Sequence, residues 1–227
     1  MIRVLPVLLL LGTFANAAAP GRPVVLELFT SQGCSSCPPA DKLLRELAQT
    51  RADLLPLAFH VTYWNQLGWK DPYSFEGATA RQASYHRISG YGGSYTPQMV
   101  IDGAADVVGS DRAGVAAAVR AAVSHAVPPL VEINRNGAVV SIEIGAGVGA
   151  GRVLLIGYDP KHRTEVPRGE NAGSTLVEAN IVRDFVPLGD WNGTSLHLVH
   201  SMPKGERLAV LIQAPSGHYL AATSEAK

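Results

Sequence analysis

Both cysteines of the chain lie in one short segment, between an apolar run and a helical pattern. Cys34 and Cys37 are followed at once by Pro38 and Pro39. The run from Val24 to Phe29 predicts a buried strand, and apolar side chains recur at helical spacing after the prolines: Ala40, Leu43, Leu44, Leu47 and Ala48. Proline is tolerated in a first helical turn because the N–H there has no partner within the helix. The sequence therefore places a C-x-x-C pair where a strand leads into a helix.

A cysteine pair at a helix N-terminus is suited to reversible chemistry. The unpaired N–H groups and the positive end of the helix dipole favour a thiolate. Lowering a thiol pKa from about 8.5 to about 6 raises the thiolate fraction at neutral pH roughly thirtyfold. Lower nucleophilicity offsets about tenfold of that gain, so the main benefit is a better leaving group. We expect Cys34 to stand exposed as the attacking thiol and Cys37 to resolve the mixed disulfide.

Two later segments extend the pattern. Thr96-Pro97 opens a short apolar strand, and the string Arg168-Gly169-Glu170-Asn171 follows much later. The C-x-x-C with its proline, the strand-helix order and Thr96-Pro97 resemble the thioredoxin superfamily. The strings 29–41 and 168–171 resemble a bacterial family of secreted thioredoxin-like proteins of unknown function. The resemblance implies a thioredoxin-like α/β fold and a cis peptide bond before Pro97, facing the cysteines.

Four other residues are candidates for the same site. Thr96 and Pro97 would form a wall facing the substrate, and Tyr63 and Trp64 lie in an aromatic segment after a second predicted strand, Leu54 to Val61. These aromatic side chains either line a groove beside the thiols or cover the hydrophobic top of the domain. Both interpretations remain open on the sequence.

Glu27 is the one carboxylate within the first apolar run. A carboxylate there must either face water or occupy a costly interior position. We expect it to be buried beneath the helix that follows the cysteines and to take part in proton transfer to Cys37. The alternative is an edge position that faces solvent.

The first 17 residues predict a secretory signal. Arg3 gives a positive start, Val4 to Phe14 an apolar stretch, and Ala15-Asn16-Ala17 a small-residue cleavage pattern. We expect a mature chain that begins at Ala18, is periplasmic or secreted, and has no stable membrane insertion. An oxidising compartment permits disulfides.

The remaining chain predicts two units. Residues 20–127 would form the thioredoxin-like domain, and residues 130–224 a small all-β, sandwich-like domain, with Pro128-Pro129 between them. About seven strands at sandwich-like spacing follow the prolines, including a hairpin at Asn136-Gly137. The candidate strands are Leu130 to Arg135, Ala138 to Ile144, Arg152 to Tyr158, Leu176 to Val186, Ser195 to Val199, Arg207 to Gln213 and His218 to Ala222. We expect the string 168–171 to pack on the first domain, although a solvated loop is an equal alternative.

Charge and composition narrow the partners. Lys plus Arg and Asp plus Glu both number 19, which argues against nucleic acid as the main partner. Gly145 to Gly151 lacks the spacing of a phosphate loop. The sequence predicts no cofactor and leaves the oligomeric state open.

Thiol-disulfide exchange with proteins or small thiols is the leading functional hypothesis. A structural disulfide is disfavoured because so short a loop removes little unfolded-state entropy. A second alternative is copper(I) or zinc handling by Cys34, Cys37 and His60, since thiolates suit these metals. A third is a non-catalytic binding module.

Overall fold

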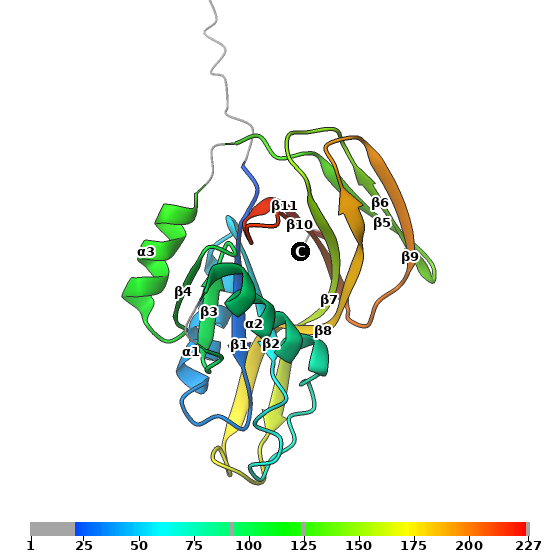
Figure 1. The fold of residues 1–227 in the computed structure, drawn as a ribbon. Coiled ribbons are helices and arrows are strands. Elements are labelled where there is room, and N and C mark those ends of the chain that lie inside the picture. The colour runs from blue at the N-terminus through cyan, green and yellow to red at the C-terminus, as the bar shows by residue number, and fades with distance from the viewer. Residues whose placement is uncertain (1–20, 91–92, 124–125, 226–227) are drawn as a thin grey trace, which may run out of the picture.

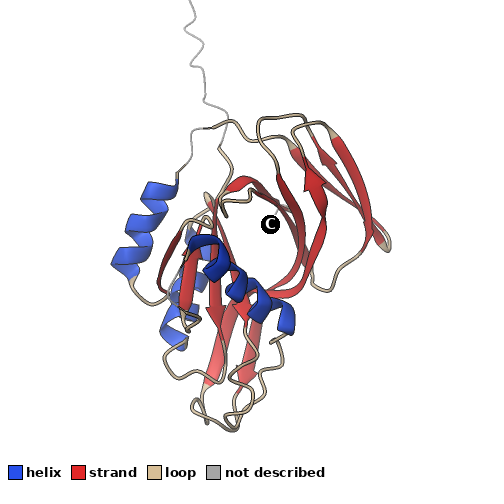
Figure 2. Cartoon of the chain, in the orientation of Figure 1, coloured by secondary structure: helices blue, strands red, loops and turns tan. Residues whose placement is uncertain are grey.

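The computed structural model describes residues 21–90, 93–123 and 126–225, and these ranges contain three helices and eleven strands (Figures 1 and 2). The helices are α1 (Pro38–Thr50), α2 (Glu76–Ser89) and α3 (Arg112–Ala122). The strands are β1 (Val24–Thr30), β2 (Leu54–His60), β3 (Gln98–Ile101), β4 (Ala105–Val108), β5 (Val131–Asn136), β6 (Val139–Ile144), β7 (Gly151–Glu165), β8 (Thr175–Trp191), β9 (Leu196–Ser201), β10 (Arg207–Gln213) and β11 (Tyr219–Ser224).

Eight strands form one mixed sheet, in the order β11-β10-β7-β8-β2-β1-β3-β4. β1 and β2 are parallel, and β8 joins β2 in parallel at the pair Ala58 and Ile181. β7 pairs antiparallel with β8 along nearly its whole length. The strands β5, β6 and β9 form a separate three-stranded sheet, which lies beside β7 and β8 in Figure 1. One sheet therefore contains strands from both halves of the chain.

This arrangement corrects the expected fold class. A thioredoxin-like α/β domain followed by a separate, small sandwich-like domain is wrong, because the large sheet runs without a break from one half into the other. Every residue of β2 is buried, so the strand needs a hydrogen-bonding neighbour along both edges. β1 supplies one neighbour and β8 the other. The position predicted for a domain boundary, Pro128-Pro129, lies between α3 and β5.

The expected strands are present, but they are distributed differently. All seven candidates after residue 130 form strands, four of which (β7, β8, β10 and β11) join the large sheet. β7 and β8 extend beyond their predicted ranges, to 15 and 17 residues. The added residues of β7 pair with the first part of β8, and this long hairpin reaches the lower end of the molecule in Figure 1.

The central strands β1 and β2 are buried on both faces. The sheet curls around α2 (Figure 2). On β1, Leu26 and Leu28 face a core shared with α1 and α3, while Val25 and Phe29 face a second core that includes residues of α2, β7 and β10. A third core fills the space between the three-stranded sheet and β7, β8, β10 and β11. The alternation along β1 follows from the two-residue period of a strand. It decides which side chains can meet α1.

Two local predictions are confirmed. Pro38 and Pro39 occupy the first turn of α1. A hairpin joins β5 to β6 at the expected place, with Gly137 at φ 60°.

The predicted signal, residues 1–17, and the predicted first residue of the mature chain, Ala18, lie outside the described residues. Within the described ranges, none of the helices combines the length and the apolar character needed to cross a membrane.

Candidate redox site at the turn between β1 and α1

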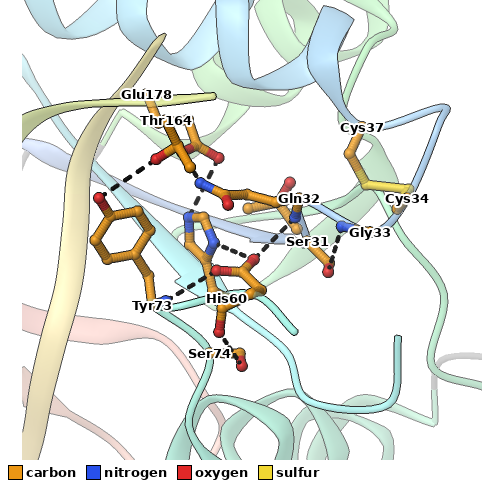
Figure 3. A network of polar contacts seen from close by, with 12 residues as sticks. Ser31, Gln32, Gly33, Cys34, Cys37, His60, Tyr73, Ser74, Thr164 and Glu178 are labelled. Carbon is orange, nitrogen blue, oxygen red and sulfur yellow. Dashed lines mark hydrogen bonds and ion pairs between the residues drawn. A yellow bond between two sulfur atoms is a disulfide. The ribbon is translucent and has the colours of Figure 1, made fainter. Parts of the chain in front are cut away.

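The two cysteines lie in the turn of residues 31–37, here called the redox turn, which connects β1 to α1 (Figure 3). Cys34 and Cys37 form a disulfide with a Cα–Cα distance of 5.4 Å. The turn is closed by backbone hydrogen bonds from Cys34 N to Ser31 O and from Cys37 N to Cys34 O, at 3.1 and 3.2 Å. Cys37 is the N-cap residue of α1. The cysteine pair therefore lies where the helix dipole favours a thiolate.

Both cysteines are fully buried, at 0% exposure, and only Ser35 and Ser36 between them are exposed. This corrects the expectation that Cys34 stands exposed at the start of the turn. A second segment, contributed by the hairpin of β7 and β8, packs on the backbone of this turn.

The covering segment is the hairpin tip, residues 166–174, between β7 and β8. Asn171 is buried, and its Nδ2 donates to the carbonyl oxygens of Gln32 and Cys34 at 2.9 and 3.0 Å. Glu170 accepts from the N–H of Ser35 at 2.9 Å. The prediction that residues 168–171 pack on the first half of the chain is confirmed.

A buried polar network of Gln32, His60, Asp71 and Glu178 lies next to the redox turn (Figure 3). Gln32 donates its N–H to Asp71 at 2.8 Å and its side-chain amide to Glu178 at 2.7 Å. His60 Nδ1 lies 2.7 Å from Asp71 Oδ2. The network thus ties the turn to the loop after β2 and to β8.

One contact within the network is incomplete. His60 Nε2 and Glu178 Oε1 are 3.8 Å apart, and neither atom has a hydrogen-bond partner within the described part of the chain. The pair is an ion pair without a hydrogen bond, in a position where the full charge of both groups is costly.

The charges of the network are mutually dependent. Burial alone would lower the pKa of His60, but the carboxylates of Asp71 and Glu178 outweigh burial and raise the pKa to about 9. The pKa of Asp71 is lowered, because the charge and hydrogen bond of His60 outweigh its burial. Burial raises the pKa of Glu178, against the opposing charge of His60. At neutral pH we therefore assign an imidazolium paired with the Asp71 carboxylate.

Asp41 is a candidate that sequence reasoning missed. It lies one turn along α1 from Cys37, with its N–H donating to the Cys37 carbonyl at 3.1 Å. Thr30 Oγ1 donates to its carboxyl at 2.8 Å, and burial, with repulsion from Glu178, raises its pKa to about 8. The i to i+4 spacing from Cys37 on a helix was the available signal.

Asp41 also reaches a small cleft. A cavity of about 170 Å³ opens between α1 and the start of β8, and it is lined by Pro38, Asp41, Lys42, Arg45, Thr175, Leu176, Val177 and Glu178. Two buried acids, Asp41 and Glu178, therefore line one cleft beside the start of the helix. The cleft offers these acids a path for proton exchange with solvent.

The predicted Thr96-Pro97 wall is partly assembled. The peptide bond between these residues is cis, as predicted. Trp64 Nε1 donates to Thr96 Oγ1 at 2.8 Å, and Trp64 also packs so closely on Gly33 that a Cβ there would lie 3.2 Å from the Trp64 Cβ. Tyr63 instead donates to Gln82 of α2 at 3.2 Å. The structure thus brings Trp64 to the redox turn, connects Thr96 to it through the Trp64 indole, and turns the Tyr63 hydroxyl towards α2.

Glu27 is buried, as predicted, but it lies on the wrong face for the proposed role. It shares a face of β1 with Val25 and Phe29, whereas α1 packs on the other face. Arg81 of α2 donates to its two carboxylate oxygens at 2.9 and 3.0 Å. Tyr85 and Tyr219 also donate to it. The structure therefore does not bring Glu27 to the cysteines, and we assign it to the core.

The alternative metal site is not assembled either. His60 is engaged by Asp71 and Glu178 rather than by the cysteine sulfurs. Across residues 21–90, 93–123 and 126–225, no group of three or more His, Cys, Asp or Glu side chains could hold a metal ion.

Fold and site together define a protein of mixed α and β structure, rich in strands, with a covered C-x-x-C disulfide at a strand-helix junction. The chain belongs to the family described as "Protein of unknown function (DUF1223)", which matches residues 25–213. No curated protein matches the chain.

Two solved structures share the fold. Protein AGR_C_4864 from Agrobacterium tumefaciens is 32% identical, with a TM-score of 0.77, over 92% of this chain and 98% of that chain. HBP35 of Porphyromonas gingivalis is 12% identical, with a TM-score of 0.64, over 92% of this chain and 76% of that chain. The second likeness concerns the fold alone.

Proposed function

We propose that the chain is an exported thiol-disulfide oxidoreductase that exchanges disulfides with proteins or small thiols, as the resemblance to the thioredoxin superfamily implies. The observation that carries the proposal is the Cys34–Cys37 disulfide at the first turn of α1, one helical turn from the buried acid Asp41. A disulfide that only braced the fold would gain little from a loop of this size.

In the oxidising direction, a substrate thiolate attacks Cys34 Sγ, and a new S–S bond forms between substrate and Cys34. The Cys34–Cys37 bond breaks, its electron pair leaves on Cys37 Sγ, and this sulfur takes up a proton. A second substrate thiolate then attacks the mixed disulfide and releases Cys34 as a thiolate. Two electrons pass from the substrate to the cysteine pair, and the reverse sequence reduces a substrate disulfide.

Asp41 is the proposed source of the proton for Cys37. With a pKa of about 8 it is mostly protonated at neutral pH, and its carboxylate can take the proton back from Cys37 when the pair is reoxidised. Its place on the cleft with Glu178 supports exchange of that proton with solvent. Glu27, on the opposite face of β1, takes no part.

The test is a trapping experiment with single cysteine variants. The Cys37→Ser variant keeps Cys34 and lacks the thiol that resolves a mixed disulfide, so it should accumulate covalent complexes that dissociate on reduction. The matched control, Cys34→Ser, loses the same disulfide but should trap few partners. Equal trapping by the two variants, or by neither, together with a Cys34 alkylation pKa like that of a free thiol, would contradict the proposed function.

A further inference from the structure

The hairpin tip, residues 166–174, is held on the redox turn by a small set of polar contacts. Asn171 donates to the carbonyls of Gln32 and Cys34, and Glu170 accepts from the N–H of Ser35. These contacts join residues that are 135 to 139 positions apart in the sequence. The tip is therefore a tertiary cover and not a continuation of the turn itself.

The tip is organised internally, so it can move as one body. Its ends are closed by hydrogen bonds from Val166 N to Ser174 O and from Gly173 N to Val166 O, at 2.9 and 2.8 Å. Gly169, at φ 79°, lies against the loop after β2, where a Cβ on Gly68 would be 3.3 Å from the Gly169 Cα. Motion of the tip would expose the redox turn without breaking the pairing of β7 with β8.

Access to the sulfurs is the reason why such a motion matters. Thiol-disulfide exchange requires an incoming sulfur to reach one disulfide sulfur. Cys34 and Cys37 are fully buried while the tip is in place. In this closed arrangement the neighbouring exposed residues, Ser35 and Ser36, offer no sulfur to attack.

We propose that the hairpin tip is a gate over the Cys34–Cys37 disulfide and that Asn171 is the positioning residue that holds it closed. The proposal rests on the proposed function for its biological meaning, because it names how access to that same site is regulated. Asn171 suits the role because its single amide group binds the carbonyls on both sides of Gly33 and is itself buried. Opening must break both hydrogen bonds at once.

The experiment measures how fast dithiothreitol reduces the Cys34–Cys37 disulfide in the full-length mature protein. Asn171→Asp keeps the shape of the side chain but replaces the donor with an acceptor that faces two carbonyls. It should raise the reduction rate about tenfold or more, since two hydrogen bonds are lost. Asn171→Ala should give a similar increase. The matched control is Ala172→Ser, at an exposed neighbour on the same tip. Its disulfide should be reduced at the wild-type rate.

A comparison of urea midpoints separates gating from loss of fold. If the disulfide of the Asn171 variants is reduced faster while their urea midpoints equal that of the wild type, the tip alone has opened. If an Asn171 variant does not fold, Glu170→Ala, which removes an exposed contact to Ser35, should still give a smaller increase in rate. Reduction at the wild-type rate in every folded variant would overturn the gate.

The same measurements distinguish the gate from the proposed function. Dithiothreitol reports access to the disulfide whether or not the protein has a natural substrate. Faster reduction with no trapping by Cys37→Ser would keep the gate and reject the oxidoreductase. Trapping by Cys37→Ser with unchanged reduction of the Asn171 variants would keep the oxidoreductase and reject the gate.

Discussion

Asp41 combines three properties in one carboxyl group: it lies one helical turn from Cys37, it is buried, and it lines the cleft between α1 and β8. Burial raises its pKa to about 8, with Glu178 adding repulsion. The native state therefore keeps a proton that the unfolded chain releases near pH 4. This difference in proton binding makes stability depend on pH.

The first prediction concerns that dependence. Between about pH 4 and pH 8, the native state binds one more proton at Asp41 than the unfolded state, so the free energy of unfolding should fall as pH rises. The pKa of His60 is raised from 6.5 to about 9, so between these pH values His60 further lowers the free energy of unfolding as pH rises. Asp41→Asn should remove the contribution of Asp41 to the slope of the free energy of unfolding against pH and leave the contribution of His60. Urea unfolding at pH 5, 6.5 and 8 measures the effect.

The matched control for Asp41 is Asp53→Asn. Asp53 is an exposed partner of Arg51, and its pKa is lowered, so its titration lies below the window. An equal slope in wild type and Asp41→Asn would show that Asp41 does not hold the proton. The pH profile of disulfide exchange should change with Asp41→Asn as well, while Asp53→Asn leaves it unaltered.

Glu27 shows how far single residues can be predicted from sequence. Its burial followed from its apolar neighbours, but its partners Arg81 and Tyr219 lie 54 and 192 positions away. The C-x-x-C pair at a strand-helix junction follows from local patterns, whereas the cis bond before Pro97 was implied by the resemblance, and both are present. Asp41, His60 and Glu178 come together only through tertiary packing, which no local pattern specifies.

At the scale of elements, hairpins carry contacts that their own sequences do not reveal. The turn between β3 and β4, at Asp102 and Gly103, has φ values of 53° and 67°. It packs on the turn between β10 and β11, where an added Cβ on Gly103 would lie 1.9 Å from the Gly217 carbonyl oxygen. Residue 103 is thus restricted both by its backbone conformation and by its neighbour.

The second prediction separates these two restrictions. Gly103→Ala should destabilise the protein by about 3 kcal/mol or more, because strain from positive φ is joined by a steric clash with backbone. The matched control is Gly137→Ala, at φ 60° with open space around it, which should cost only about 1 to 2 kcal/mol. Chemical denaturation gives both values. Equal losses would mean that the two turns do not pack as described.

The hairpin of β7 and β8 explains why the cysteine turn could be predicted from the sequence but its burial could not. The sequence indicated strands at Arg152 to Tyr158 and Leu176 to Val186, yet β7 continues to Glu165, next to the tip. Of the added residues of β7, Asp159 is buried and charged, and those from Pro160 to Glu165 alternate between half-buried and exposed, so their apolar signal is weak. Their pairing with β8 places the tip over the cysteines.

At the scale of the whole molecule, the halves of the chain share one sheet and several buried networks. β2 pairs with β8, and Asn180 donates to the Pro56 carbonyl at 2.7 Å beside that junction. Arg81 donates to Glu27 of the first half and to Gln213 of the second. The helices and strands of both halves were largely predictable from periodicity, but the order of strands was not. Strand order depends on which strand edges pair, and periodicity carries no information about pairing. Nothing in the sequence indicated that β2 pairs with β8 across the two predicted units.

The third prediction follows from this shared sheet. The protein should unfold in urea in a single transition, because separating the halves would expose the fully buried strand β2 and break the buried hydrogen bonds from Arg81 to Gln213 and from Tyr219 to Glu27. Trp191 lies in the core of the second half, whereas Trp64 and Trp69 lie beside the redox turn and its polar network. The Trp191→Phe variant therefore reports on the first half by fluorescence, and circular dichroism reports on all strands and helices. The urea midpoints from fluorescence and from circular dichroism should coincide for that variant, and the wild type is the reference for its stability.

Residues 20–127 produced alone should lack a cooperative transition, since β2 would present an open edge. Two separate midpoints, or a cooperatively folded fragment, would show that the halves are independent despite their common sheet.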